Sequence, residues 1–301
     1  MPFIAFALRR VSRGLLTLLF AITLTFVLLR TLPGDPARAV AGERMTPELQ
    51  KVLRNEFGLD QPLLVQYGKY LWQLFHGNLG VSFARNVPVT DVLFERLPWT
   101  LLLTGSALVV TILIGVPLGV LAASRFGGVV DRSAQVLGAL GQSVFVPSAG
   151  IFLLFVFGLQ MGWFPIGGSV SPDVYGMDWY LSVARHLVLP AASLVLVQLG
   201  PYLLMMRSSM IDALGEDYCT LARANGLPYR RILWRHALRN ALLPTTTLTG
   251  LQLGFLAGGA VLTETVFAYP GVGRAIFEAV TQLDFPMLQG AFVLLAFTVI
   301  V

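Results

Sequence analysis

Long uncharged stretches alternate with charged segments along the whole chain. The stretches cover residues 14–29, 98–124, 133–160, 187–206, 241–263 and 285–301. A helix needs about 20 apolar residues to cross the hydrocarbon core of a bilayer. The pattern therefore predicts an all-α, polytopic membrane bundle with six transmembrane helices. The last stretch is still apolar where the given sequence ends, so the sixth helix is expected to be incomplete.

The first stretch has two interpretations. Arg9, Arg10 and Arg13 precede a short apolar run, and Ala39-Val40-Ala41 resembles a cleavage site, as in a secretory signal peptide. However, the run is long for a signal core, it lies ten residues from that site, and further apolar stretches follow. These features favour a retained first transmembrane helix within residues 1–30, with its N-terminus in the cytoplasm.

Residues 31–98 form a polar insert, which lies outside the cytoplasm if the N-terminus lies inside. Thr46, Pro47 and Glu48 are typical of a helix start, and Gly58 is typical of its end. A second, amphipathic helix is predicted from about residue 62 to 76. Its apolar face consists of Leu63, Leu64, Tyr67, Tyr70, Leu71, Leu74 and Phe75. The insert either packs on the bundle as a lid or forms a docking surface for a soluble protein.

Glycine recurs within the second and third stretches. Small residues let transmembrane helices approach closely. We therefore expect Gly115, Gly119, Gly138 and Gly141 to serve helix packing rather than to line a pore. A second external loop, 161–185, carries Trp163, Trp179 and Tyr180, which are residue types that gather at membrane interfaces.

Residues 212–244 form a basic loop, DALGEDYCTLARANGLPYRRILWRHALRNALLP, between the fourth and fifth stretches. Loops rich in arginine stay on the cytoplasmic side. Asp212 can cap a first helix, Asn225-Gly226 is a typical helix end, and Pro228 is typical of the start of a second helix. The second helix is expected to carry Ile232, Leu233, His236 and Leu243. The loop is predicted to form a rigid helix–turn–helix projection.

Composition and charge agree with a membrane protein. Hydrophobic residues make up 55% of the chain and charged residues 12%, with a mean hydropathy of +0.73. The predicted inner segments hold 11 of the 21 basic residues and 4 of the 16 acidic ones, which is the expected direction for this topology. The net charge of +5 is thus explained by orientation in the membrane, and a nucleic-acid partner is not expected.

The loop 212–244 resembles the cytoplasmic "EAA" loop of ABC-transporter permease subunits. Ala222 and Gly226 match its second alanine and its glycine, whereas Thr220 and Leu221 replace the glutamate and first alanine. His236-Ala237-Leu238-Arg239 replaces the Ile-x-Leu-Pro of the pattern. ARANGLPYRRILWRHALRNALLP is similar to the dipeptide/oligopeptide branch of the family. PGDP, LDQPLLVQY, GNLGVSF and VFAYPGVGRAIFEAVTQLDFPMLQG are similar to external segments of the same branch.

The resemblance implies the architecture of a type I ABC importer and its assembly. Such a permease pairs with a second similar permease, two ATP-binding subunits and an extracytoplasmic binding protein that delivers peptide. Each permease then forms half of the translocation pathway. ATP and Mg²⁺ bind to the partner ATPases, so no cofactor is expected in this chain. Relatives in the branch import dipeptides, oligopeptides, nickel chelates or glutathione, and nothing in the residues separates these substrates.

The resemblance also places the contact with the ATPase on the short helix of the loop and the turn after it. The residues concerned are Glu216, Asp217, Tyr218, Leu221, Ala222, Arg223, Ala224, Asn225, Gly226 and Leu227. Arg223 is expected to pair with acidic residues of the ATPase, with a solvated loop residue as the alternative. Glu264 closes the fifth stretch. It is interpreted as a hydrated carboxylate at the outer end, with an outer-gate or pathway role as the alternative.

Several classes of chemistry are absent from the sequence. No P-loop, G-x-S-x-G or H-E-x-x-H motif occurs, and Cys219 is the single cysteine. The chain is therefore not expected to be an enzyme or to bind a metal. A gradient-driven carrier or channel would need ionisable groups within its spans, which are almost missing here. A scaffold that binds anionic lipid through the basic loop is a further alternative, but the family segments favour the permease.

Overall fold

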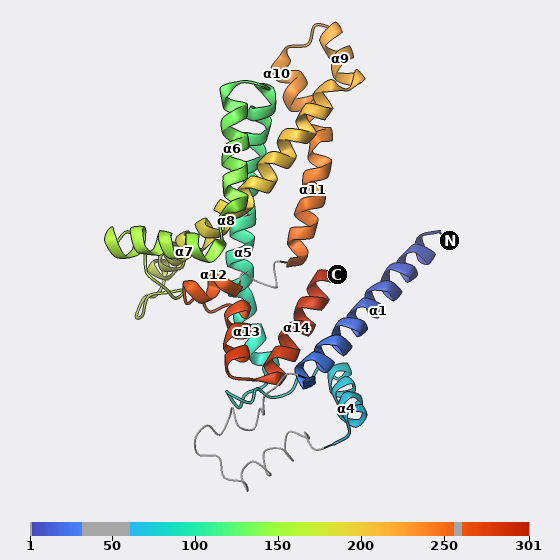
Figure 1. Ribbon diagram of the computed structural model, residues 1–301, viewed down its shortest axis with the longest axis vertical. Coiled ribbons are helices and arrows are strands. Elements are labelled where there is room, and N and C mark those ends of the chain that lie inside the picture. Colours follow the sequence, from blue (N-terminus) through green and yellow to red (C-terminus); the bar gives the residue numbers. More distant parts are fainter. Residues whose placement is uncertain (1, 32–60, 256–260, 301) are drawn as a thin grey trace. The chain divides into compact units, whose positions relative to one another are not determined.

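The computed structural model describes residues 2–31, 61–255 and 261–300 (Figure 1). Within these ranges the regular structure is helical, apart from an isolated β-bridge between Val81 and Pro88. The chain divides into two compact units. The first comprises Met1–Thr100, Ala257–Val261 and Pro270–Val301, and the second comprises Leu101–Leu256 and Leu262–Tyr269. The all-α, polytopic class predicted from the sequence is confirmed.

The first unit is built around α14. It contains α1 (Pro2–Thr31), α4 (Leu63–Phe75), the start of α5 (Val89–Ser124), α13 (Val272–Thr281) and α14 (Phe285–Ile300). Helix α14 packs against both α1 and α13. Side chains of α1, α5, α13 and α14 form a common core, among them Leu29, Leu93, Ile276 and Leu288.

Polar contacts fix the loop that precedes α5. Asp284 accepts hydrogen bonds from the Ser82 hydroxyl and from the backbone N–H groups of Phe83 (3.1 Å) and Ala84 (3.3 Å). Nearby, Glu278 pairs with Arg85 at 2.6 Å, with Arg96 at 3.2 Å and with Arg274 at 2.9 Å. These contacts hold the loop against α13 and the start of α14.

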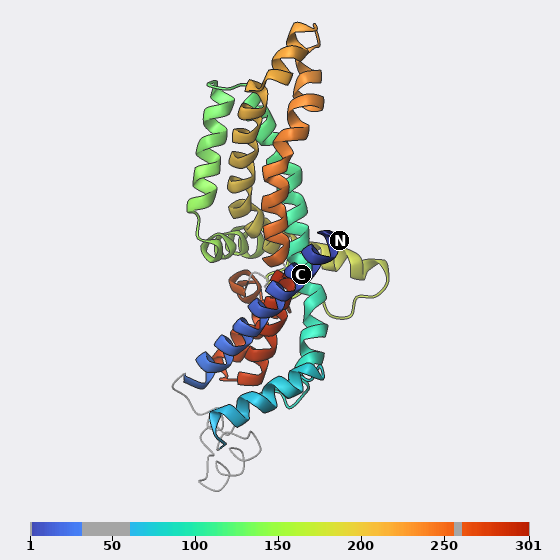
Figure 2. The same cartoon turned by 90° about the vertical axis from the view of Figure 1, so that its right-hand side faces the viewer.

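The second unit is a bundle around α8 (Met177–Gly215). It contains the rest of α5, α6 (Val129–Ser143), α7 (Val146–Leu153), the π-helix η2 (Leu154–Gln160), α9 (Asp217–Ala224), α10 (Tyr229–Arg231), the π-helix η3 (Ile232–Ala237), α11 (Leu238–Phe255) and most of α12 (Val261–Val266). Helices α6, α7 and α11 each pack on α8, and Figure 2 shows α6, α8 and α11 running side by side.

Glycine allows the closest of these approaches. A Cβ atom on Gly119 of α5 would lie 2.6 Å from Cβ of Met206 and 2.8 Å from the carbonyl oxygen of Leu203, both on α8. On α6, a Cβ on Gly138 or Gly141 would likewise meet α8 at under 3 Å. The prediction that these glycines serve helix packing is confirmed.

The structure supports three of the six predicted spans as single helices. Within the described residues, Ser12–Thr31, Val89–Ser124 and Met177–Gly215 are long and apolar enough to cross a membrane. Both α5 and α8 extend beyond the apolar stretches into segments that were expected to be loops. The sixth stretch forms α14, which has 16 residues.

The third stretch is not one straight helix. It forms α6 followed by α7 and η2, with a bend of 98° between the two parts. Val144 and Phe145 are extended at the break, and Pro147 stands in the first turn of α7, where its missing N–H costs no hydrogen bond.

The fifth stretch is described in two parts. Helices α10, η3 and α11 follow one another directly, so that the predicted second loop helix and the start of this stretch form one helical run. Residues 256–260 lie outside the described residues, and α12 follows. A count of six transmembrane helices therefore stays a prediction.

The polar insert is described only from residue 61. The helix predicted between Thr46 and Gly58 lies outside the described residues. The second predicted helix is confirmed as α4, which begins after Pro62 and ends before His76. Its predicted apolar face does not pack as one surface, because Leu64 is 85% exposed and Phe75 is 83% exposed, whereas the polar Gln66 is buried.

Candidate functional site

The candidate site is the segment between α8 and α11. Helix α8 continues through Asp212 to Gly215, and Glu216 then adopts an extended conformation as the N-cap of α9. The prediction that Asp212 caps the first loop helix is therefore wrong. Asp212 stands within the last turn of α8, because the helix is stabilised by packing of its apolar side and does not stop where charges begin. The short helix begins at Asp217 instead.

One side of α9 is anchored in the second unit. Cys219 and Ala222, one helical turn apart, are buried against a core that includes Met206 and Met210 of α8 and Ile232 and Leu233 of η3. Burial raises the pKa of the Cys219 thiol, so that this group stays neutral. The helix is thus fixed by packing, not by its own eight residues.

The turn after α9 is closed by two backbone hydrogen bonds. The N–H of Gly226 donates to the carbonyl of Arg223 at 3.0 Å, and the N–H of Leu227 donates to the carbonyl of Ala222 at 3.2 Å. Gly226 has a φ of +73°, so these bonds form the Schellman motif that ends many helices. The predicted stop at Asn225-Gly226 is confirmed, and Pro228 is the N-cap of α10 as expected.

The other side of α9 is not covered by the rest of the described chain. Asp217, Thr220, Leu221, Arg223 and Ala224 are exposed, and the Leu221 side chain reaches 63% exposure. Among the remaining predicted site residues, Glu216, Asn225 and Gly226 are exposed, Tyr218 and Leu227 are half-buried, and Ala222 is buried. The ten residues therefore form one continuous structure with an exposed surface and a buried support.

Hydrogen bonds tie this segment to neighbouring helix ends. Arg223 donates from Nη2 to the carbonyl of Leu214 at 3.2 Å and so satisfies a carbonyl in the last turn of α8. Tyr229 donates from its hydroxyl to the carbonyl of Ser124, the last residue of α5, at 3.4 Å. The predicted pairing of Arg223 with an ATPase stays a prediction.

An ion pair that the sequence analysis missed lies in the same unit. Arg207 of α8 contacts Asp131 of α6 through both Nε and Nη2, the latter at 2.8 Å from Oδ2. Asp131 also accepts a hydrogen bond from the N–H of Gly127 at 3.0 Å, and the guanidinium carbon of Arg207 lies 5.6 Å from the ring centroid of Phe126. The two residues are 76 positions apart, so no local pattern in the sequence could indicate this pair.

Glu264 is not hydrated as expected. It lies in α12 with no exposed surface, so the hydrated interpretation is wrong. Its backbone carbonyl accepts a hydrogen bond from the N–H of Tyr269 at 2.8 Å, and burial together with the charge of Glu264 raises the pKa of the Tyr269 hydroxyl. An outer-gate or pathway role for Glu264 stays a prediction.

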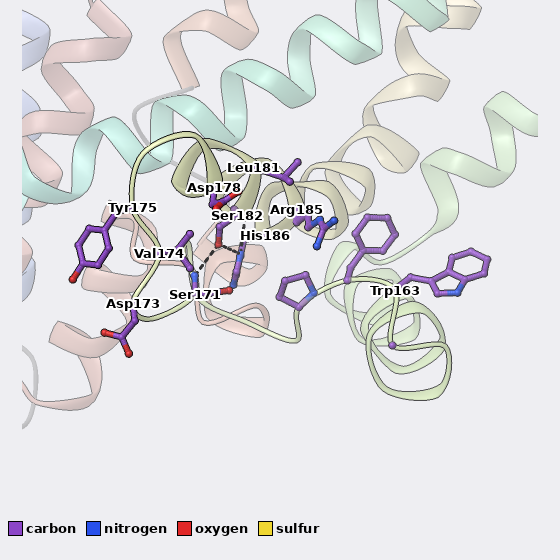
Figure 3. A pocket seen from close by; sticks show the side chains of 13 residues that line it. Trp163, Ser171, Asp173, Val174, Tyr175, Asp178, Leu181, Ser182, Arg185 and His186 are labelled. Carbon is purple, nitrogen blue, oxygen red and sulfur yellow. Dashed lines mark hydrogen bonds between the residues drawn. The ribbon is translucent and has the colours of Figure 1, made fainter.

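A pocket of about 610 Å³ lies between the start of α8 and the loop before it (Figure 3). Ser182 accepts a hydrogen bond from the N–H of Ser171 at 2.9 Å, and His186 Nδ1 lies 2.8 Å from the carbonyl of Ser182. Figure 3 shows these three residues together, whereas Asp173 and Tyr175 point away from them. The predicted external aromatics Trp163 and Tyr180 are exposed on the same loop and helix.

Comparison with known proteins decides the family. The model of the binding-protein-dependent transport system inner membrane component matches residues 115–301. The model of the N-terminal part of the binding-protein-dependent transport system membrane component matches residues 3–104. The chain belongs to this family of permeases. The permease is thus a membrane-embedded transport subunit and not an enzyme, and such systems include a binding protein and an ATPase.

Individual relatives match along nearly the whole permease. A putative peptide transport system permease protein of Brucella abortus strain 2308 is 39% identical over 293 residues, which cover 97% of this chain and 92% of the relative. The dipeptide transport system permease protein of Escherichia coli K12 is 37% identical over 315 residues, covering 98% and 93%. A probable peptide ABC transporter permease of Sinorhizobium fredii NGR234 is 36% identical over 291 residues, covering 97% and 92%.

Proposed function

We propose that this permease imports peptides as part of an ATP-driven complex. The names of the relatives, which refer to peptides and dipeptides, support this substrate class. In the proposed complex the chain pairs with a second similar permease, and each forms half of the pathway. Two ATP-binding subunits hold ATP and Mg²⁺, and an extracytoplasmic binding protein delivers the peptide. No cofactor belongs to this chain.

The coupling element of the proposed complex is α9 with its turn. The observation that carries this assignment is a short helix with one side anchored by Cys219 and Ala222 and the other side exposed. A helix held in this way can transmit force from a partner that contacts its exposed side. The partner drives transport only if it fits α9 differently in its two states. In the proposed complex, ATP hydrolysis switches the ATPase between these two states.

The proposed topology places the N-terminus and residues 212–244 in the cytoplasm. The excess of arginine in these segments supports this orientation. Residues 31–98 then lie on the opposite side, where they help to form the docking surface for the binding protein.

Deletion of residues 46–76 is expected to abolish stimulation of ATP hydrolysis by the binding protein in a complex that still assembles. Unchanged stimulation would remove this role.

Purification from the native membrane tests the assembly. The tagged permease, extracted in mild detergent, is expected to bring along a second permease and ATPase subunits, and the eluate is expected to hydrolyse ATP. Reconstituted into vesicles with the binding protein, the complex should take up a labelled dipeptide only with ATP. A chain that purifies alone and moves solute without ATP would instead indicate a gradient-driven carrier.

A single substitution tests the coupling element. Gly226→Val forces a β-branched residue into a positive φ, which costs about 1–2 kcal/mol and opens the turn after α9. We expect ATP hydrolysis to become uncoupled from peptide uptake, or the ATPase to dissociate, while the chain still inserts into the membrane.

The matched control is Gly215→Val at the other end of the loop. Gly215 also has free space around its Cα, but its φ is not in the left-handed region. This variant is expected to keep coupled transport. Normal uptake by the Gly226→Val complex would show that α9 and its turn do not couple the two activities.

A further inference from the structure

Two neighbouring cavities in the first unit differ sharply in character. The polar cavity, of about 540 Å³, is lined by polar residues of α4, the C-terminal end of α1, the N-terminal end of α14 and the loop before α5. The apolar cavity, of about 330 Å³, is lined only by leucine, isoleucine, valine and phenylalanine side chains of α1, α4 and α14 and by Leu79. Leu79 lines both cavities.

The two cavities follow each other along the helices. On α1 the polar cavity is lined by Phe26 and Arg30, and the apolar cavity begins one helical turn earlier, at Ile22. Helix α14 also contacts both cavities. Gln289, near its start, lines the polar cavity, and Val293, one helical turn later, lines the apolar cavity. An elongated ligand with a polar end and an apolar tail would fill both.

Three hydrogen-bond donors at the polar cavity have no acceptor among the described residues. Nε of Arg30, Nε2 of Gln289 and the hydroxyl of Tyr70 are buried, and none has a hydrogen-bond partner among the residues that the structure describes. Gln289 as a whole is only 7% exposed. Burial raises the pKa of Tyr70 to about 12, so its hydroxyl stays protonated and able to donate. Buried polar atoms are normally paired, which points to an acceptor from a bound molecule.

The charge of the polar cavity specifies the acceptor further. Arg30 and Lys69 bring two positive charges, and the described side chains that line the cavity include no carboxylate. The ligand group is therefore an anion with several acceptor oxygens, such as a phosphodiester. Basic pockets between transmembrane helices are typical sites for anionic lipid headgroups.

The exposed side chains of α4 favour a position of this site at a membrane surface. Its residues Leu63, Leu64, Trp72 and Phe75 are exposed large apolar side chains on an amphipathic helix of 13 residues. Such a helix lies in the membrane interface with its apolar side towards the acyl chains. In this position the polar cavity would be at the level of headgroups, and the apolar cavity lies along α1, which is long and apolar enough to span the membrane.

We propose that the first unit binds one anionic phospholipid, with its phosphate in the cavity of Arg30, Tyr70 and Gln289 and an acyl chain in the apolar cavity between α1, α4 and α14. The two cavities share no residue with α9 and its turn. Charge holds the phosphate of the lipid, and apolar contacts hold its acyl chain. Tight binding therefore requires both parts of the lipid.

Native mass spectrometry of the purified complex tests the site with palmitoyl-oleoyl phosphatidylglycerol as the probe. We expect one tightly held lipid per permease, with weaker retention of the zwitterionic phosphatidylcholine. Arg30→Gln should weaken retention about tenfold, the effect of losing one charge-assisted hydrogen bond. Arg10→Gln is the matched control, because it removes the same charge from an exposed position of the same helix.

A second pair of variants tests the acyl chain. Leu19→Trp fills the apolar cavity and should also weaken retention, whereas Leu16→Trp enlarges another exposed leucine of α1 that does not line the cavity and should not. The proposal is overturned if Arg30→Gln and Leu19→Trp retain the lipid as their controls do. It is also overturned if inorganic phosphate alone displaces the lipid, or if phosphatidylcholine is held equally well.

Discussion

Asp131 and Arg207 show how much a single polar contact can matter inside a membrane bundle. Asp131 is almost fully buried and Arg207 is mostly buried, so each charge depends on the other. Removing one partner of such a pair leaves an uncompensated charge, which costs roughly 3–5 kcal/mol, whereas an apolar replacement of both is often neutral.

Asp131→Asn is therefore expected to lower the thermal unfolding temperature of the detergent-solubilised chain. The double variant Asp131→Leu/Arg207→Met should recover most of that loss. As a control, Asp212→Asn removes an exposed charge and should have little effect. A double variant that is no more stable than Asp131→Asn would show that the pair does not contribute through charge compensation.

Cys219 gives a second test at the residue scale. Its thiol is fully buried and its raised pKa keeps the reactive thiolate scarce. We expect maleimide to label Cys219 in the unfolded chain but not in the folded one. Leu221→Cys, two residues away on the exposed side of α9, should react in the folded chain and become protected when the ATPase is added. Rapid labelling of native Cys219 would contradict the placement of α9.

At the scale of elements, close packing of α5 on α8 depends on Gly119. Gly119→Val would force side-chain atoms into Met206 and into the backbone of Leu203, which has no freedom to move away. We expect a destabilisation of about 1–3 kcal/mol or more, measured as loss of folded protein in detergent. Gly105→Val in the same helix is the control, since nothing lies within 4 Å of its added Cβ.

The elements were predictable from the sequence where hydrophobicity decides them. The first, second and fourth apolar stretches became long helices, and Gly226 ended α9 because only its backbone conformation fits that turn. The start of α9 was not predictable from Asp212, since a helix does not end merely because polar residues begin. The 98° bend before Pro147 and the full burial of Glu264 depend on contacts between distant segments, which a single sequence does not reveal.

In the molecule as a whole, the bent pair of α6 with α7 and η2 has its two ends either on opposite sides of the membrane or on the same side. The charge pattern predicts opposite sides, with residues 125–132 inside and the loop 161–185 outside. A re-entrant segment would instead bring both ends to one side.

Two exposed positions distinguish these topologies. Val129→Cys should react with a membrane-impermeant maleimide only in inside-out vesicles, and Trp163→Cys only in intact spheroplasts. The buried Cys219 provides the unreactive background. Labelling of both positions from the same side would contradict the proposed topology.

The length of α8 has a mechanical consequence for the permease. Its 39 residues extend over roughly 58 Å, about twice the thickness of a hydrocarbon core. Ser182 and His186 near its start line the pocket of Figure 3, and Leu214 near its end is bonded to Arg223 of α9. One continuous helix, α8, therefore joins the pocket to the coupling helix. Any tilt imposed at α9 reaches the pocket without passing through a loop, and only Pro190 and Pro201 could act as joints along the way.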